Sequence, residues 1–386
     1  MNTPNKDQKR LLKELDKFHK SDSKHIFTYS GPPGSGKTWV IGLFFEKNHI
    51  KSDEYITCAY SGKAANVLAM RGLPARTIHS LIYNVYIDRK ELPNGTFVYK
   101  PEFVLKDHLD KKYKYIVVDE LSMVPDSIME DVLSFGIKVI GMGDINQLPP
   151  VFGESSYMLR PDFCLTQIMR QAEGSPIIQL CQMVLHDQHI SYGDYGDCRV
   201  LTRIPLDSKW VTDYDMILCN RNSTRDAIND FIRHDLYKIS GNHPVIGDKI
   251  MCKQNNWDMC SYGTYLTNGT VGYVSDIFEE TETSSKVHID FTADFSDKCV
   301  FQDIPVDLKY LYGNYMERKD YGISSYTKFE YANAITVHSS QGSQYDRILY
   351  IDDGFSGSRD TLKKLKYTAI SRAAKRIDIV NGYGLF

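Results

Sequence analysis

Residues 31–38 read Gly31-Pro32-Pro33-Gly34-Ser35-Gly36-Lys37-Thr38 and match the pattern G-x-x-x-x-G-K-[ST] at every fixed position. A short apolar run at 26–29 precedes this loop, and an apolar helix is predicted after it, at 39–45. In this strand–loop–helix order the glycines let backbone N–H groups close around phosphate oxygens. The stretch therefore predicts a nucleoside-triphosphate site at the start of an α/β domain.

Two carboxylates follow another apolar strand, in the stretch Tyr115-Ile116-Val117-Val118-Asp119-Glu120. Ligands gather at the carboxyl ends of parallel strands, so we expect this pair beside the phosphate loop. We assign Thr38 and Asp119 to Mg²⁺, and Glu120 to activation of the attacking water as general base. Lys37 is assigned to the β- and γ-phosphate oxygens. The other phosphate contacts are assigned to Gly31, Pro32, Gly34, Ser35 and Gly36.

Short apolar runs alternate with helical patterns at both ends of the chain, which predicts an α/β fold with parallel sheets covered on both faces. Thr3 and Pro4 are expected to be the N-cap and first residue of an N-terminal helix. Buried strands are expected at 26–29, 56–59, 115–118, 139–142, 216–219, 334–337, 348–351 and 377–380. This grouping predicts a first domain over 1–162 and a second over 163–244 and 331–386.

Two segments break the α/β rhythm. Asn94-Gly95 stands between two strand-like runs, which predicts a β-hairpin at about 84–110, inserted in the first domain. Short strands separated by glycine turns predict a small β-barrel at 245–330, inserted in the second. The hairpin is either a surface decoration or a wedge, and Leu92 or Phe97 would then be the wedge residue.

The composition excludes several classes of protein. The 386 residues, 42% hydrophobic and 25% charged, are typical of a soluble globular protein of two or three domains. The net charge of −3 excludes a bulk attraction for nucleic acid, so any such binding must come from a local groove. No apolar run approaches the ~20 residues of a membrane span, and the polar N-terminus argues against export. The eight cysteines lack C-x-x-C spacing, which favours a reduced, cytoplasmic setting without zinc or disulfides.

A third motif, Gly143-Asp144-Ile145-Asn146-Gln147-Leu148-Pro149-Pro150, follows the strand at 139–142. Its order and spacing resemble motif III of superfamily-one helicases, and the resemblance extends over most of the chain. Other family motifs are matched, in order, by Gln8 (the adenine-reading glutamine), 59–65 (motif Ia), 77–80 (Ib), 165–170 (IV), 336–344 (V) and 367–372 (VI). The pattern is most like that of the RecD-like, Dda-like branch, which also carries an inserted hairpin and an inserted barrel.

The resemblance implies two RecA-like parallel-sheet domains in tandem, with ATP and Mg²⁺ between them. It implies translocation 5′ to 3′ on single-stranded DNA and separation of duplex at a fork. Arg170 and Arg372 would stabilise the transferring γ-phosphoryl group, and Gln147 would couple it to DNA. Nucleotide contacts are implied for Gly342 and Gln344 as well as Gln8. DNA contacts are expected from Ser61, Thr77, His79, Phe97, Thr336 and His338.

Other interpretations stay open at this point. An RNA helicase or remodeller of the same superfamily would carry the same motifs, and no feature here identifies a reader of the 2′-OH. An ATP-driven single-strand-binding subunit of a larger nuclease or replication complex is a further alternative, although Glu120 and both arginines argue against an inactive ATPase. We expect a compact monomer, in the host cytoplasm if phage-encoded, with replication or recombination proteins as candidate partners.

Overall fold

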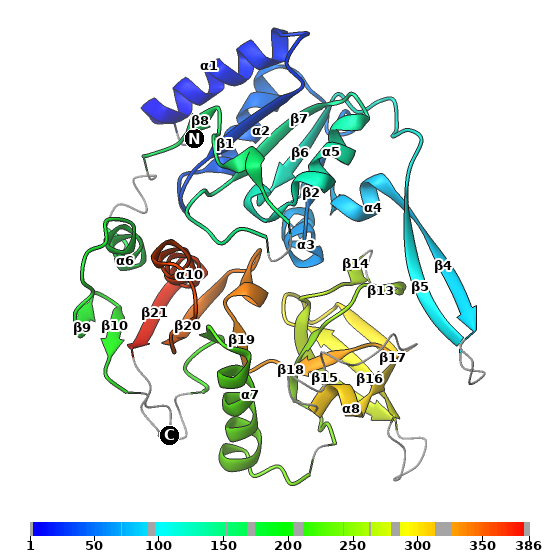
Figure 1. The fold of residues 1–386 in the computed structure, drawn as a ribbon, viewed down its shortest axis with the longest axis vertical. Helices are drawn as coiled ribbons and strands as arrows, with labels where there is room; N and C mark the ends of the chain where they lie inside the picture. The colour runs from blue at the N-terminus through cyan, green and yellow to red at the C-terminus, as the bar shows by residue number, and fades with distance from the viewer. Residues whose placement is uncertain are drawn as a thin grey trace.

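The computed structural model describes residues 3–70, 72–91, 97–150, 153–167, 174–203, 211–241, 243–261, 264–278, 286–312 and 326–381. Two α/β sheets lie one above the other, and a mainly antiparallel β unit lies beside the lower one (Figure 1). Among the helices of these residues, none is long and apolar enough to cross a bilayer. All eight cysteines are free thiols.

The first sheet has six parallel strands in the order β3-β2-β6-β7-β1-β8. Its strands are β1 (Ile26–Ser30), β2 (Tyr55–Ala59), β3 (Ala75–Thr77), β6 (Tyr115–Asp119), β7 (Lys138–Gly143) and β8 (Phe163–Cys164). Its helices are α1 (Lys6–Lys20), α2 (Lys37–Lys47), α3 (Gly62–Met70), α4 (Ile78–Ile82) and α5 (Asp126–Ser134). Alternate residues of β6 enter two separate apolar clusters, one with α1 and α2 and one with α4 and α5. The predicted parallel sheet, covered on both faces, is confirmed.

Two details of this domain differ from the prediction. The expected boundary after residue 162 is wrong, because β8 pairs with β1 and extends the first sheet to Cys164. A strand of two residues has no periodicity that a sequence can reveal. The expected cap at Thr3-Pro4 is also wrong, since α1 begins after Asn5. The Asn5 side chain accepts the Gln8 N–H at 2.9 Å, and the Gln8 side chain accepts the Asn5 N–H at 3.0 Å. This reciprocal pair is a capping box, and it satisfies two N–H groups at the start of the helix.

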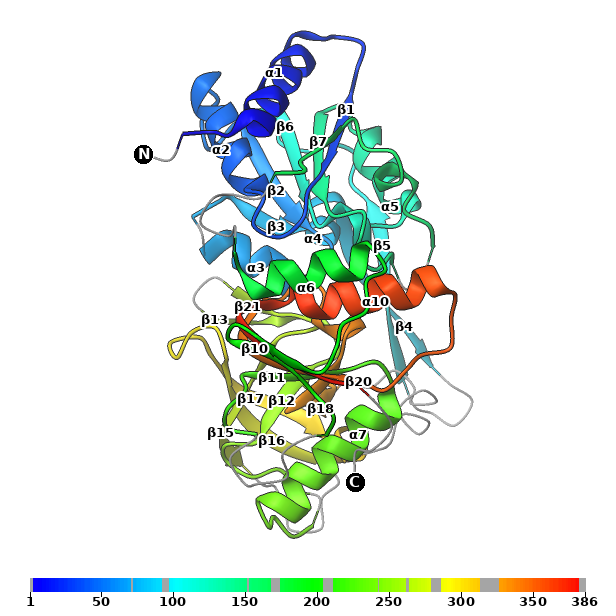
Figure 2. The ribbon, with the colours of Figure 1, turned by 90° about the vertical axis from the view of Figure 1, so that its left-hand side faces the viewer.

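The second sheet has the order β19-β11-β20-β21-β10-β9, parallel except for the last pair. Its strands are β9 (Gly193–Tyr195), β10 (Cys198–Leu201), β11 (Met216–Cys219), β19 (Ala334–Thr336), β20 (Tyr345–Asp352) and β21 (Ala373–Asn381). Its helices are α6 (Pro176–Leu185), α7 (Asn222–Asp230), which continues into a π-helical turn at Phe231–Leu236, and α10 (Arg359–Ser371). Helices α6 and α10 pack side by side between the two sheets (Figure 2).

The antiparallel unit is a five-stranded sheet in the order β17-β16-β15-β12-β18. Its strands are β12 (Lys249–Cys252), β15 (Val271–Phe278), β16 (Lys286–Ala293), β17 (Val300–Asp307) and β18 (Phe329–Tyr331), with β13 (Asn256–Ser261) and β14 (Thr264–Leu266) paired beside it and α8 (Leu308–Tyr312) after β17. The Thr327 N–H donates to the Pro305 carbonyl at 2.8 Å, so the chain entering β18 meets the opposite edge strand. The sheet therefore curls on itself.

A separate antiparallel pair projects from the first domain (Figure 1). It consists of β4 (Tyr83–Glu91) and β5 (Phe97–Leu105), in register from Tyr83 opposite Leu105 to Glu91 opposite Phe97. Leu92 and the predicted turn at Asn94-Gly95 lie outside the described residues, as does the side chain of Phe97.

Candidate active site

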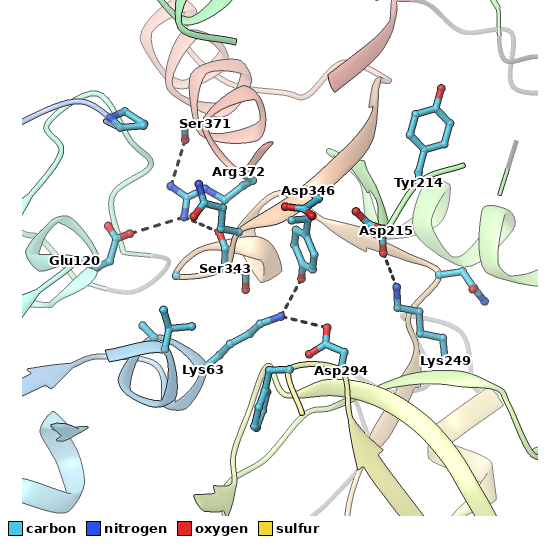
Figure 3. A pocket seen from close by; sticks show the side chains of 18 of the residues that line it. Lys63, Glu120, Tyr214, Asp215, Lys249, Asp294, Ser343, Asp346, Ser371 and Arg372 are labelled. Carbon is cyan, nitrogen blue, oxygen red and sulfur yellow. Dashed lines mark hydrogen bonds and ion pairs between the residues drawn. The ribbon is translucent and has the colours of Figure 1, made fainter. Parts of the chain in front are cut away.

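A cavity of about 1500 Å³ lies between the two α/β domains and extends to the curled sheet (Figure 3). The first domain lines it with the phosphate loop and with residues that follow β6 and β7. The second domain lines it with the segment before β20 and the end of α10. The predicted site residues brought together here are Pro32, Gly34, Gly36, Lys37, Thr38, Asp119, Glu120, Gln147, Gly342, Gln344 and Arg372.

The phosphate loop has the backbone of an anion cradle. Gly34 and Gly36 have φ values of +76° and +79°, a backbone conformation that residues with a Cβ rarely adopt. A Cβ on Gly31 would lie 2.5 Å from the Ser35 hydroxyl, so a larger residue there would have to displace that hydroxyl. The Lys37 ammonium donates to the Gly31 carbonyl at 2.7 Å and thus already lies against the loop. With α2 starting at Lys37, free N–H groups and the helix dipole favour a phosphate at this position.

Gln8 packs against the phosphate loop and is bonded to its backbone. Its side chain is buried, and its Nε2 donates to the Ser35 carbonyl at 2.9 Å, while its oxygen closes the capping box of α1. Gln8, which is predicted to contact the nucleotide, therefore lies beside the phosphate loop. Its side-chain amide orients the backbone of Ser35.

Asp119 and Glu120 reach the cavity from the carboxyl end of β6. Glu120 has φ +50°, a left-handed conformation that is uncommon for a residue with a Cβ and concentrates at functional sites. Its N–H donates to Asp119 Oδ1 at 2.9 Å, which orients the Asp119 carboxylate. The described residues contain no group of three or more His, Cys, Asp or Glu suited to a metal ion. Thr38 and Asp119 nevertheless fit Mg²⁺, which uses few protein oxygens beside those of a phosphate.

Arg372 brings the second domain to the same point. It follows α10 directly, is buried, and its Nη1 lies 3.8 Å from Glu120 Oε1. The same nitrogen donates to the Ser343 carbonyl at 3.2 Å, which fixes the direction of the guanidinium. Arg372 Nε and Gln147 Oε1 are buried without a hydrogen-bond partner. Buried polar atoms are nearly always paired, so these two, from opposite domains, fit a polar ligand in the cleft.

Two turns of the same construction stand at the predicted DNA-contacting positions. Thr77 ends β3 and Thr336 ends β19, and each hydroxyl accepts a serine N–H at 3.2 Å, from Ser80 and Ser339. Each threonine also donates to the hydroxyl of that serine at 3.0 Å. Both turns read Thr-x-His-Ser, a repeat that is visible in the sequence itself. One such turn therefore lies on each α/β domain.

Ser61 lies where these two domains meet. Its hydroxyl accepts the Ala64 N–H at 3.2 Å at the start of α3. A Cβ on Gly342, which has φ +74°, would lie 2.9 Å from that hydroxyl. The predicted motifs Ia and V are thus in contact across the domain boundary. Arg170 lies outside the described residues.

Lys63 is a residue whose role the sequence did not reveal. It is buried, donates to the Tyr345 hydroxyl at 3.1 Å, and lies 3.8 Å from Asp294 Oδ2. Figure 3 shows Lys63 pointing toward Asp294, beside the curled sheet. Tyr345 begins β20 of the second α/β domain. A Cβ on the neighbouring Gly62 would lie 2.0 Å from Thr267 Oγ1. The start of α3 therefore joins all three parts of the molecule.

Both turn histidines are half-buried beside aromatic side chains. Burial lowers the pKa of His79, which contacts Tyr60, Tyr83 and Phe103, and also that of His338, which contacts Phe355.

A depressed pKa makes these imidazoles bind protons less readily in the folded than in the unfolded protein. The stability they contribute is complete above the ordinary pKa of about 6.5 and is lost as the pH falls. We expect the free energy of unfolding of a His79→Phe/His338→Phe variant to fall less than that of the parent between about pH 7 and pH 5. Urea unfolding at each pH measures this, and equal losses in the two proteins would contradict it.

Comparisons with known proteins agree with this geometry. A model of the AAA domain matches residues 3–196, half of the chain, and one of the UvrD-like helicase C-terminal domain matches residues 331–380. The ATP-dependent RecD2 DNA helicase of Deinococcus radiodurans is 30% identical over 201 residues, which cover 50% of this chain and 26% of that protein. The Dda helicase of Enterobacteria phage T4 is 24% identical over 269 residues, covering 60% of this chain and 57% of Dda.

The chain belongs to the RecD-, Dda- and Pif1-like superfamily-one helicases. The predicted family is therefore confirmed. This superfamily-one protein also shares its fold with a Bacteroides Pif1 bound to single-stranded DNA, with a TM-score of 0.58 at 18% identity, over 98% of this chain and 92% of that one. The RecA-like helicase fold is confirmed. The chain spans about a quarter of RecD2 and little more than half of Dda.

Proposed function

We propose that this chain is an ATP-dependent DNA helicase that moves 5′ to 3′ on single-stranded DNA and separates duplex at a fork. The observation that carries the proposal is the approach of Arg372 to Glu120, 3.8 Å apart, from opposite domains in one cleft. A nucleotide in that cleft would contact both domains, so its binding would favour closure and loss of its γ-phosphate would remove that bias.

The proposed hydrolysis divides its tasks among groups already in the cleft. Lys37 and the loop N–H groups bind the β- and γ-phosphates, and Glu120 takes the proton of the attacking water. Thr38 and Asp119 would hold Mg²⁺, which supplies charge neutralisation on the phosphate oxygens when bound. Arg372, together with Arg170, stabilises the negative charge that spreads over the transferring group. Gln147 is proposed to couple the presence of the γ-phosphate to the binding of DNA.

The DNA track is proposed to follow the two Thr-x-His-Ser turns and Ser61. Hydroxyls and backbone N–H groups hold phosphates without reading sequence, which suits a motor that passes any base. One turn on each domain would let closure and opening move the strand by alternating grip. His79 and His338 would contact or orient the backbone beside Thr77 and Thr336.

The β4–β5 pair is proposed to be the inserted hairpin that separates the strands, and the curled sheet to be the inserted barrel. Near its base the pair exposes four apolar side chains, namely Val85, Tyr86, Phe103 and Val104. Opening a base-pair step costs about 1.4 kcal/mol of stacking, so apolar surface at the fork would stabilise unstacked bases. Leu92 and Phe97 remain the proposed wedge residues.

Strand displacement on two partial duplexes tests the proposal. One duplex carries a 5′ single-stranded tail and the other a 3′ tail of the same sequence. We expect ATP-dependent unwinding from the 5′ tail alone, since the motor must load on the strand along which it moves. Unwinding from the 3′ tail alone would overturn the polarity, and ATP turnover stimulated by RNA but not DNA would overturn the substrate. The proposal also includes a monomer acting in the cytoplasm, with replication or recombination proteins as candidate partners.

A further inference from the structure

The loop at 144–148 is bonded across the cleft to the second domain. The Tyr367 hydroxyl donates to Asp144 Oδ2 at 2.7 Å, and the Leu148 N–H donates to Thr368 Oγ1 at 3.0 Å. A third bond runs from Gln341 Nε2 to the Leu148 carbonyl, also at 3.0 Å. Asp144, Tyr367 and Thr368 are each 0% exposed, so these bonds are made away from water.

Asp144 holds the turn of the 144–148 loop and also makes the contact with Tyr367. Its Oδ1 accepts the Asn146 N–H at 3.0 Å, which forms the turn of the loop, while its Oδ2 accepts the Tyr367 hydroxyl. A hydrogen bond to a buried carboxylate is among the stronger ones, because the charge has little competing solvation. The tyrosine hydroxyl therefore orients the carboxylate and, through it, the loop that carries Gln147.

Tyr367 and Thr368 also lie close to the arginine of the cleft. Both are on α10, about one turn of ~5.4 Å before its end, and Arg372 follows that end directly. A helix transmits a shift over one turn with little loss, since its backbone bonds hold the turn together. The 144–148 loop and the Arg372 guanidinium are thus connected through a single helical turn.

We propose that Tyr367 is a positioning residue which, through Asp144, makes the 144–148 loop and Arg372 move as one unit. Displacement of Gln147 by ligand would then be passed to Arg372, and a change at the DNA side would reach the γ-phosphate by the same route. This inference rests on the proposed function, and it identifies the contact that couples ATP hydrolysis to the binding of DNA.

Another tyrosine provides a matched control. Tyr350, in β20, is also 0% exposed, and its hydroxyl donates to Asn220 Oδ1 at 3.0 Å. That bond stays within the second domain and does not cross the cleft. Tyr367→Phe and Tyr350→Phe therefore remove the same group from equally buried positions, and only the first removes a contact between domains.

ATP turnover of the full chain, with and without a single-stranded DNA oligomer, separates the two roles. In Tyr367→Phe we expect kcat with DNA to fall about tenfold, the effect of losing one hydrogen bond to a charged group, while KM for ATP stays unchanged. Tyr350→Phe should keep the kcat and KM of the parent. Thermal unfolding of both variants shows that each is folded. Equal loss of kcat in the two variants would overturn the positioning role.

A double-mutant cycle tests the route through Asp144. Asp144→Leu removes both carboxylate oxygens and with them the partner of the Tyr367 hydroxyl. We expect Tyr367→Phe to lower kcat in the parent. It should add nothing in the Asp144→Leu background, because the partner is already absent there. Additive losses in that background would overturn the inference.

The outcomes for the positioning role and for the proposed function can be told apart. A parent chain without DNA-stimulated turnover would overturn the proposed function. A stimulated parent with an equally stimulated Tyr367→Phe variant would overturn only the positioning role.

Discussion

ATP turnover by an Arg372→Ala variant is expected to fall by about 10³–10⁵-fold, the contribution of an arginine that stabilises a transferring phosphoryl group. In the structure this guanidinium is buried, lies 3.8 Å from the Glu120 carboxylate, and keeps its Nε unpaired. No other described residue of the second domain presents a guanidinium to the cavity. Because the charge that Arg372 is proposed to stabilise develops in the transition state, nucleotide binding should weaken far less than kcat.

Single-turnover hydrolysis and binding of a fluorescent ATP analogue would measure the two effects separately. Arg359→Ala is a matched control, because Arg359 begins the same helix with its side chain 84% exposed and pairs with Asp187. It should behave as the parent. Arg372→Lys keeps the charge without the planar donor fork and should recover only part of the loss. Turnover by Arg372→Ala close to that of the parent would refute the assigned role.

The second large effect is expected from Lys37→Ala, which should lower turnover by at least about 10²–10³-fold and abolish unwinding. The Lys37 ammonium lies against the phosphate loop, 2.7 Å from the Gly31 carbonyl. Under the proposed function, its loss would remove the positive charge assigned to the β- and γ-phosphate oxygens. Single-strand binding should be largely retained, because Ser61 and the two Thr-x-His-Ser turns do not depend on it.

Lys47→Ala controls for the loss of a lysine from α2. Lys47 ends that helix, is 57% exposed and pairs with Asp16 on α1. It should leave turnover and unwinding intact. Fluorescence anisotropy with a labelled oligomer measures binding in the same samples. Hydrolysis that survives Lys37→Ala would show that the phosphate site is misassigned.

The phosphate loop and the Asp119-Glu120 pair were predictable because their chemistry is contained in contiguous residues. The buried strands were predictable for a similar reason, since a parallel strand covered on both faces is a run of apolar residues. The cap of α1 was not, because Thr3-Pro4 matches a common helix start and only the reciprocal bonds between Asn5 and Gln8, seen in the structure, place the cap at Asn5.

Contacts between distant segments were beyond the reach of the sequence. Lys63 and Tyr345 each stood in or beside a recognised motif, yet nothing in either stretch indicates that they meet. Asp144 and Tyr367 are a second example, brought together only by the packing of α10 against the loop after β7. Such contacts depend on how whole domains are placed, which local periodicity does not encode. The roles of Arg170 and Phe97 remain predictions from the motifs alone.

The two Thr-x-His-Ser turns are built alike, one on each α/β domain, and in each the serine N–H donates to the threonine hydroxyl at 3.2 Å. Two phosphate-binding turns with the same structure do not by themselves favour movement in either direction along a strand. Under the proposed function, direction then depends on which turn releases its phosphate first as the cleft opens. That order is set where the domains differ, in the nucleotide cleft and its connections to the turns. The polarity of movement would therefore be determined by the order in which the two turns release the strand.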